Sequence, residues 1–379
     1  MIHFVQPLEP ERLRTAFNND VVRFYTDLSA EPNHADVTLG TGPTIRLYPA
    51  PDGRFYFNFK PYVTTLINTS NFEDTLQTEL TVNDVTSFAL PAPGIALQLE
   101  VTINITAAYD VTDSATLTLN WLAATQQLGS YRALAVEDVH VLTPHRTDAA
   151  NGHYLKYWVG YPFDISFYST PGTLGITNQT NLLSQNIPLA EGGTRLFFGD
   201  GRTDETLEDL LPLNDGFNTL QLLRTGDADI KTQFITIEKE ANCSGVYLKW
   251  FNAQGGYSYW LFADTYSIDR SAKSLGELDR DFENLPNTFG RTIQTGRQSQ
   301  DTLKIVAELL TPAQRDIVQN LLESPKVYLF TGQPYSRSSY RDWIEVSVKT
   351  SSARIRNARE TLTNFAFDIE LPERFTQML

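Results

Sequence analysis

Five histidines are the first candidates for metal binding or acid–base chemistry in this sequence. His140, His145 and His153 lie close together, whereas His3 and His34 are isolated. A zinc site needs three or four ligands that converge on one point, usually at short and regular spacings. The spacing of these histidines matches no such pattern, so we interpret all five as solvated loop residues and predict no metal site.

An acidic segment at 199–205 has the composition of a calcium-binding loop. Counted from Asp200, however, the third, sixth and twelfth positions hold Arg, Glu and Leu. An EF-hand needs an acidic or amide residue, a glycine and a glutamate at these positions. We favour a solvated acidic turn, and an irregular calcium site formed by Asp200, Asp204 and Glu208 is the alternative.

Residue types that enzymes use in catalysis occur in this chain, but not in a recognisable catalytic motif. Acidic pairs such as Glu137-Asp138 and Asp279 with Asp281 could serve a glycosidase, but acidic residues are common in this chain. Cys243, the single cysteine, has no recognisable partner. Nucleophile-elbow, phosphate-loop and dinucleotide-binding motifs are missing from the sequence. We therefore predict no catalytic residues, no cofactor and no enzymatic activity, with a hydrolase on a β scaffold as the least favoured class.

The composition is that of a folded protein with an acidic surface. The chain has 379 residues, of which 41% are hydrophobic and 20% charged, and its net charge is −15. This charge argues against general attraction to a nucleic-acid backbone. The first residues lack a basic segment followed by a long apolar one, and no run of about 18 apolar residues occurs. We expect neither a signal peptide nor membrane insertion.

A long stretch of strict alternation reveals the architecture that must position any site. Apolar residues alternate with small or polar ones over 95–106, and a second alternating run covers 116–121. Period-2 alternation is typical of strands with one buried face. Since a polar segment separates the runs, they predict a long antiparallel hairpin. Phe55, Phe57 and Phe59 predict a further strand on the same principle.

Two aromatic segments share the pattern Gly-x-Tyr-Leu-Lys-aromatic-aromatic. They cover 152–158 and 245–251, and each precedes a turn and a further aromatic strand. The pattern predicts two similar hairpins, which arose either by duplication of a β unit or by convergence. If the aromatic side chains were exposed, they could form a platform that stacks on sugars: Tyr154, Tyr157, Trp158, Tyr161, Tyr247, Trp250, Tyr257, Tyr259 and Trp260.

The C-terminal part contains a long polar segment and one clear helix. Residues 269–300 are polar and without periodicity, which predicts a projecting loop or arm. Thr311, Pro312 and Gln314 form a helix start with a capping box, and Pro325 ends the helix. Strands follow at 327–330, 343–349 and 363–371.

These elements predict a mainly β protein made of tandem antiparallel β-sandwich domains. We place an N-terminal β-sandwich at 1–130 and a second β domain with an aromatic hairpin at 131–230. A C-terminal domain at 231–379 would carry the single flanking α-helix at 312–323 and the long loop, or arm, at 269–300.

The C-terminal third resembles structural proteins of tailed-bacteriophage tails. The aromatic hairpin at 247–262, the polar arm, the helix at 311–323 and the strand at 343–349 follow one another as in distal tail and tail-tube-like baseplate proteins. The resemblance covers about 231–379 and implies a tube-like β-sandwich with a flanking helix. It also implies a virion protein, made in the host cytoplasm, that forms a homo-oligomeric and sixfold (hexameric) ring.

Such a ring would be a conduit for DNA and an attachment platform for other tail proteins. We predict no specific nucleic-acid binding. The isolated apolar residues of the arm are too few for a core but sufficient to bind a neighbouring subunit. The alternative is a carbohydrate- or receptor-binding adhesin module of the β-sandwich type. The predicted subunit-interface residues are Leu275, Leu278, Phe282, Leu285 and Phe289.

Overall fold

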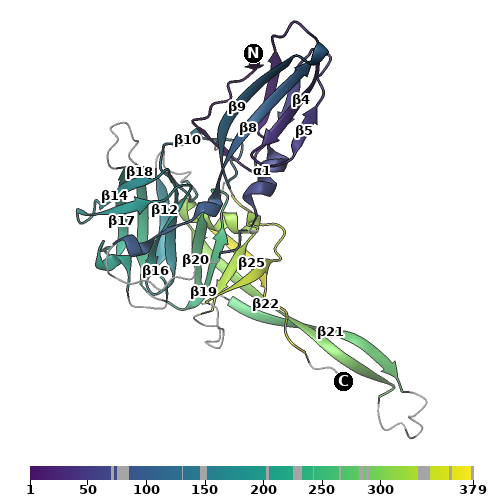
Figure 1. Cartoon of the computed structure of the whole chain (residues 1–379). Helices are drawn as coiled ribbons and strands as arrows, with labels where there is room; N and C mark the ends of the chain where they lie inside the picture. Colours follow the sequence, from purple (N-terminus) through teal and green to yellow (C-terminus); the bar gives the residue numbers. More distant parts are fainter. Residues whose placement is uncertain are drawn as a thin grey trace.

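The structure is a computed structural model, in which strands hold 54% of the chain and helices 10%; this confirms the mainly β class. The described strands form five sheets, arranged as an N-terminal unit, a middle unit and a C-terminal unit with a long projecting hairpin (Figure 1). The structure describes residues 1–69, 72–74, 85–129, 131–145, 152–201, 205–224, 233–241, 243–263, 266–280, 286, 290–331, 342–357 and 361–376.

The N-terminal unit contains a three-stranded sheet and a six-stranded sheet. Their strand orders are β1-β3-β6 and β10-β2-β9-β8-β4-β5, and only β2 and β9 pair in parallel among these described strands. The strands are β1 (Ile2–Phe4), β2 (Arg12–Thr15), β3 (Val21–Thr26), β4 (Pro32–Leu39), β5 (Thr44–Leu47), β6 (Phe55–Asn58), β8 (Ala96–Ala107), β9 (Thr112–Leu122) and β10 (Leu134–Ala135).

The long hairpin predicted from the alternating residues is confirmed as β8 and β9. The two strands pair in an unbroken antiparallel register. Val101, Ile103 and Ile105 are buried, whereas Glu100 and Asn104, which alternate with them, are exposed. The alternation therefore marks the buried face of the six-stranded sheet.

The middle unit consists of a four-stranded sheet and a five-stranded sheet. Their strand orders are β11-β13-β16-β7 and β12-β18-β17-β14-β15. Strand β18, which the sequence analysis placed in 231–379, therefore completes a sheet of the middle unit. The strands are β7 (Ala89–Pro91), β11 (His140–Val141), β12 (His153–Trp158), β13 (Phe163–Tyr168), β14 (Gly172–Asn178), β15 (Leu183–Leu189), β16 (Thr194–Gly199), β17 (Gly216–Arg224) and β18 (Gln233–Glu240).

The first aromatic hairpin predicted from the sequence is wrong, because its two strands lie in different sheets. Strand β12 pairs in parallel with β18, whereas β13 pairs antiparallel with β11 and β16. Gly160, at φ 85°, lies in the turn between them. Every residue of β13 is buried, so its sequence has no alternation that could identify its neighbours.

The C-terminal unit is built on a seven-stranded sheet of order β20-β19-β23-β24-β25-β22-β21. The second aromatic hairpin is confirmed here, since β19 and β20 pair antiparallel along their whole length. The strands are β19 (Gly245–Phe251), β20 (Tyr257–Ala263), β21 (Tyr266–Asp279), β22 (Thr292–Leu310), β23 (Val327–Phe330), β24 (Trp343–Val348) and β25 (Thr363–Glu370).

The described parts of 269–300 form a projecting β-hairpin, so of the predicted loop or arm the structure shows an arm (Figure 1). Strand β21 pairs antiparallel with β22, from Tyr266 opposite Ile305 to Asp279 opposite Thr292. This two-stranded ribbon, here called the arm, extends away from the body of the protein (Figure 1). No residue of β21 is buried. An exposed ribbon needs no apolar face, and for this reason its sequence lacks the period-2 pattern of the other strands.

Two α-helices are described, α1 (Lys60–Ile67) and α2 (Pro312–Val318). The capping box of α2 is confirmed, because Thr311 and Gln314 bond each other's backbone, and a 3₁₀ helix (Gln319–Glu323) completes the predicted segment. Helix α1 has no side-chain N-cap and was not predicted from the sequence. No helix in the described part of the chain is long and apolar enough to cross a bilayer.

Aromatic contacts join the middle and C-terminal units into one hydrophobic core. The ring centroids of Trp158 and Trp260 lie 5.2 Å apart, and those of Tyr161 and Tyr247 lie 4.6 Å apart. Each pair brings together a residue from 153–161 and a residue from the β19–β20 hairpin. The two aromatic segments that resemble each other in sequence therefore pack against each other in space.

Candidate functional site

The histidines lie mostly in strands, so their interpretation as loop residues is wrong for His3, His34, His140 and His153. The ring centroids of His145 and His153 are 5.1 Å apart, and His153 Nδ1 lies 3.1 Å from the Thr143 hydroxyl. Burial, with the positive charges of His145 and Arg132, lowers the pKa of His153 to about 3. Among the described residues, no group of three His, Cys, Asp or Glu side chains converges on a metal position.

Those residues considered for calcium and for catalysis that the structure describes form no metal-binding group with one another. Asp200 is buried, Glu208 is paired with Lys239, and Asp204 lies outside the described residues. Cys243 is exposed, and its carbonyl accepts a hydrogen bond of 2.8 Å from the Tyr161 hydroxyl. Of the acidic pair in the arm, Asp279 is at the end of β21 and Asp281 is outside the described residues.

The aromatic platform considered for sugar binding is not on the surface. All nine of its side chains have a relative exposure of 7% or less. Because sugar stacking needs an open ring face, these residues cannot form the predicted platform. They form the core between the middle and C-terminal units.

A cluster of buried charged side chains lies where the three units meet. Asp164 of β13 and Arg195 of β16 come from the four-stranded sheet, and Lys249 comes from β19. Asp74 follows α1 in the N-terminal part of the chain. These four side chains are at most 4% exposed.

Arg195 is the centre of this cluster. Its Nε and Nη2 atoms donate to the two carboxylate oxygens of Asp164 at 2.9 and 2.6 Å, and its Nη1 atom donates to Asp74 at 2.8 Å. Lys249 Nζ donates to the other oxygen of Asp74 at 2.6 Å, and the Tyr259 hydroxyl donates to Asp164. Two carboxylates and two cations thus balance one another inside the core.

Burial and charge act in opposite directions on the acids and bases of this cluster. Burial alone would raise the pKa of Asp74, but Arg195 and Lys249 outweigh it and hold this pKa well below its usual range. Burial lowers the pKa of Lys249, and Asp74 opposes this effect. Burial raises the pKa of Tyr259, and the charge of Asp164 adds to the effect.

Perturbed pKa values occur both in active sites and in structural ion-pair networks. Neither the hollow beside β2 nor the hollow beside Leu309 is lined by any residue of this cluster. We therefore interpret the cluster as a structural link between the three units. One signal could have revealed it from the sequence, namely a single charged residue inside each of three strongly apolar strands.

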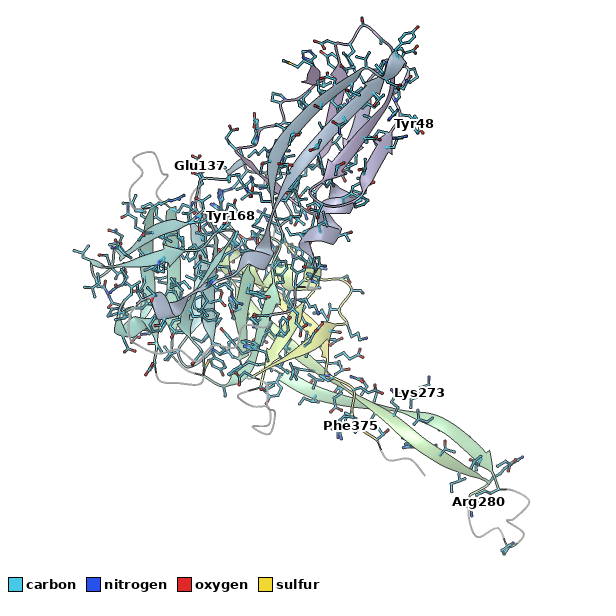
Figure 2. The ribbon with its side chains drawn as sticks, in the orientation of Figure 1. Tyr48, Glu137, Tyr168, Lys273, Arg280 and Phe375 are labelled. Atoms are coloured by element: carbon cyan, nitrogen blue, oxygen red, sulfur yellow. The ribbon has the colours of Figure 1, made fainter. Side chains whose placement is uncertain are left out.

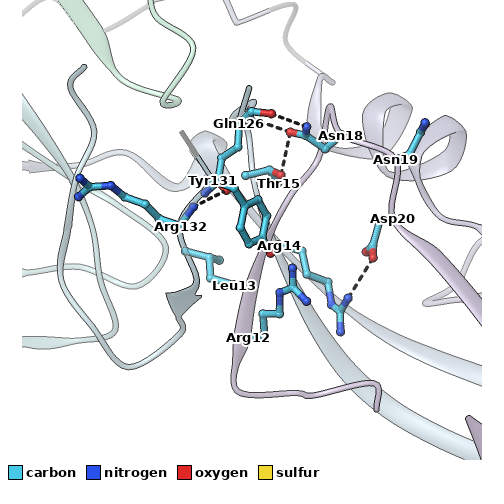
Figure 3. A pocket seen from close by; sticks show the side chains of 10 residues that line it. All are labelled: Arg12, Leu13, Arg14, Thr15, Asn18, Asn19, Asp20, Gln126, Tyr131 and Arg132. Carbon is cyan, nitrogen blue, oxygen red and sulfur yellow. Dashed lines mark hydrogen bonds and ion pairs between the residues drawn. The ribbon is translucent and has the colours of Figure 1, made fainter. Parts of the chain in front are cut away.

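The hollow beside β2 has a volume of about 310 Å³ and is shown in Figure 3. Asn18 links two parts of the wall of this hollow. Its side chain accepts a hydrogen bond from the Thr15 hydroxyl at 2.9 Å and donates one to the Gln126 carbonyl at 2.7 Å. Arg14 donates to Asp20 at 3.0 Å. These hydrogen bonds connect β2 and the residues after it to the segment after β9. The hollow therefore lies along a polar contact between two parts of the N-terminal unit.

The arm is the surface on which the predicted subunit interface can be tested. Leu275 and Leu278 of β21 are 47% and 57% exposed, and Ile268, which the sequence analysis did not select, is also 47% exposed. Phe282, Leu285 and Phe289 lie outside the described residues. Figure 2 shows Lys273 and Arg280 on the same ribbon, so the arm presents apolar and charged side chains together.

Ion pairs brace the arm where it leaves the body. Asp301 of β22 accepts hydrogen bonds from Arg270 of β21 at 2.6 and 3.0 Å and from Arg374 at 2.9 Å. The hydrogen bond from Arg270 is the main cause that lowers the pKa of Asp301. These contacts fasten both the arm and the C-terminal segment to β22. Phe375 of that segment is fully exposed beside the arm (Figure 2).

Comparison with known proteins gives no family. No family model matches the chain, and no curated protein matches its sequence. Among solved structures, fibronectin(III)-like modules of Clostridium thermocellum CbhA are 6% identical, with a TM-score of 0.20 over 64% of this chain and 95% of theirs. A tri-modular GH5 endo-β-1,4-glucanase from Bacillus licheniformis is 6% identical, with a TM-score of 0.18 over 59% of this chain and 35% of its own. The Bacillus anthracis TIE protein is 8% identical, with a TM-score of 0.15 over 80% of this chain and 52% of its own. Similarities at this level define neither a shared fold nor a shared function.

Proposed function

We propose that this chain is a structural subunit that assembles with copies of itself into a sixfold ring in the tail of a tailed bacteriophage. The resemblance of 231–379 to distal tail and tail-tube-like baseplate proteins suggests the location. The projecting arm is the single observation that carries the proposal. In this role the protein has no enzymatic activity, and the ring is a platform for other tail proteins.

The arm has the properties of an element that binds a neighbouring copy. Strand β21 is at the edge of the seven-stranded sheet, so its outer backbone groups have no strand partner among the described strands. Fourteen residues at about 3.3 Å each make this edge roughly 45 Å long. Such an edge readily accepts another strand, and a closed ring gives every copy the same partner.

The composition of the chain agrees with a conduit for DNA. A net charge of −15 would repel the phosphate backbone and let DNA pass without binding. The buried charge cluster agrees with the role of a ring subunit. It links the three units and would keep the arm in a fixed direction relative to the other sheets.

Substitution of the two exposed leucines of the arm tests this proposal. We expect the intact protein to form the ring and the Leu275→Asp/Leu278→Asp variant to remain a folded monomer, because two charges would disrupt an apolar contact without touching a core. Sedimentation velocity measures the oligomeric state, and circular dichroism checks the fold.

The matched control is Leu182→Asp, which places a charge on a still more exposed leucine of the middle unit. This control should assemble like the native protein. Assembly of the double arm variant into the same ring would show that these leucines are not the subunit contact.

A further inference from the structure

One face of the N-terminal unit combines exposed aromatic rings with positive charge. The three-stranded sheet β1-β3-β6 buries Ile2, Phe24 and Phe55 on its inner side. By strand alternation, the residues between them point outward. Tyr25 and Tyr56 are 39% and 56% exposed on this outer face.

The strand register places the outward residues in two neighbouring rows. His3 lies opposite Tyr25, and their rings stack with centroids 5.3 Å apart at an interplanar angle of 24°. Arg23 lies opposite Tyr56 in the next row. Val5, whose backbone N–H donates to the Arg23 carbonyl at 2.9 Å, extends this row and is 45% exposed. The face thus presents two separate ring surfaces around an exposed arginine.

Arg23 supplies an exposed positive charge on this face, in contrast to the acidic composition of the whole chain. Arg23 has no ion-pair partner in the described part of the chain, and the exposed Arg54 precedes β6. Three carboxylates at the margins of the face are already paired: Asp27 bonds His3 and the N-terminus, Asp113 is 2.9 Å from the N-terminus, and Asp52 is 3.7 Å from Arg54. Arg23, exposed and beside two aromatic rings, is complementary to the carboxylate of an anionic ligand.

We propose that the outer face of β1-β3-β6 binds a carboxylated polysaccharide. Sugar rings would stack on Tyr25 and Tyr56, and a sugar carboxylate would pair with the planar guanidinium of Arg23. Tyr25 and Tyr56 lie on neighbouring strands but one row apart, a diagonal separation of roughly 7–8 Å, so each would stack on a different sugar ring of the chain. An acidic sugar carries the ring face and the charge in one unit, whereas a glycerol phosphate polymer has no ring to stack. The nine buried aromatics proposed from the sequence have no part in this site.

Isothermal titration of the full chain with polygalacturonate and hyaluronate tests the proposal, with dextran as the neutral polymer. We expect binding to at least one carboxylated polymer and none to dextran. The Tyr25→Ala/Tyr56→Ala variant should lose about tenfold in affinity because both stacking surfaces are removed. The Tyr25→Phe/Tyr56→Phe variant keeps the rings and should bind like the native chain, which separates stacking from any effect on the fold.

The matched control is Tyr48→Ala, which removes a still more exposed tyrosine elsewhere on the N-terminal unit (Figure 2). It should not change affinity. Three results would overturn the proposal: no binding to either carboxylated polymer, unchanged binding by the double alanine variant, or equally tight binding of poly(glycerol phosphate). The monomeric Leu275→Asp/Leu278→Asp variant should bind like the native chain, so the outcome is independent of ring assembly.

Discussion

Asp164 shows how much of the stability of this protein rests on single buried charges. It accepts two hydrogen bonds from Arg195 and one from Tyr259 while fully buried. We expect Asp164→Asn to lower the free energy of unfolding by about 3–5 kcal/mol, because Arg195 would lose its main counter-charge in the core. Equilibrium denaturation in urea measures this change.

The comparison for Asp164 is Asp36→Asn. Asp36 pairs with Arg46 at 2.8 and 2.9 Å, but the Arg46 side chain is 55% exposed. A solvated pair contributes at most about 1 kcal/mol, so this variant should unfold almost like the native protein. Similar losses in the two variants would contradict the structural role of the buried cluster.

His153 should make the stability of the protein depend on pH. Its pKa is lowered to about 3 in the folded chain, against about 6.5 in an unfolded chain. Between these values the unfolded chain binds a proton that the folded chain does not, so stability falls as the pH decreases from about 6.5 towards 3. In His153→Gln this contribution is missing, and the free energy of unfolding should fall less steeply between pH 7 and pH 4. Parallel curves for the two proteins would contradict a neutral, half-buried His153.

At the scale of elements, the N-cap of α2 and the buried face of β24 can be compared by one substitution in each. Thr311→Ala removes the N-cap of α2 and should cost about 1 kcal/mol. Val346 of β24 is 6% exposed, so Val346→Asp should cost about 3 kcal/mol or more through an unpaired buried charge. Thermal denaturation should show a clearly larger decrease in melting temperature for Val346→Asp, and equal decreases would contradict the assigned faces.

How much could be predicted from the sequence depended on whether one face of an element is buried. The hairpin of β8 and β9 has one buried face, and its alternation predicted it correctly. Strand β13 is buried on both faces and β21 on neither, so both lack alternation, and their pairing was predicted wrongly or not at all. A period-2 pattern therefore identifies strands with one buried face, but not strands that are buried on both faces or on neither.

The candidate sites follow the same physical rule. The aromatic residues chosen for sugar binding lie in strands whose neighbours cover both faces, which the sequence does not show. Tyr25 and Tyr56 become a surface only when the register of β3 and β6 is known. The charge cluster also depends on contacts between residues far apart in the chain, since Asp74 and Lys249 meet across 175 positions.

The whole molecule combines a body held by a shared core with an arm that has no core of its own. Aromatic contacts and the buried charge cluster fix the three units to one another. The arm, by contrast, exposes nearly all of β21, and Asp301 braces it where it leaves the body. This division is expected of a subunit that keeps its own fold and uses one element to bind its neighbours.

The mass of the intact protein in solution tests the central claim of assembly most directly. The chain has a mass of 42.7 kDa. Sedimentation velocity at micromolar concentration should reveal a closed particle of about six times this mass, as expected for a closed ring. Electron microscopy of the same sample should show rings. A stable monomer of 42.7 kDa over the whole concentration range, with no particle in the images, would contradict the proposal.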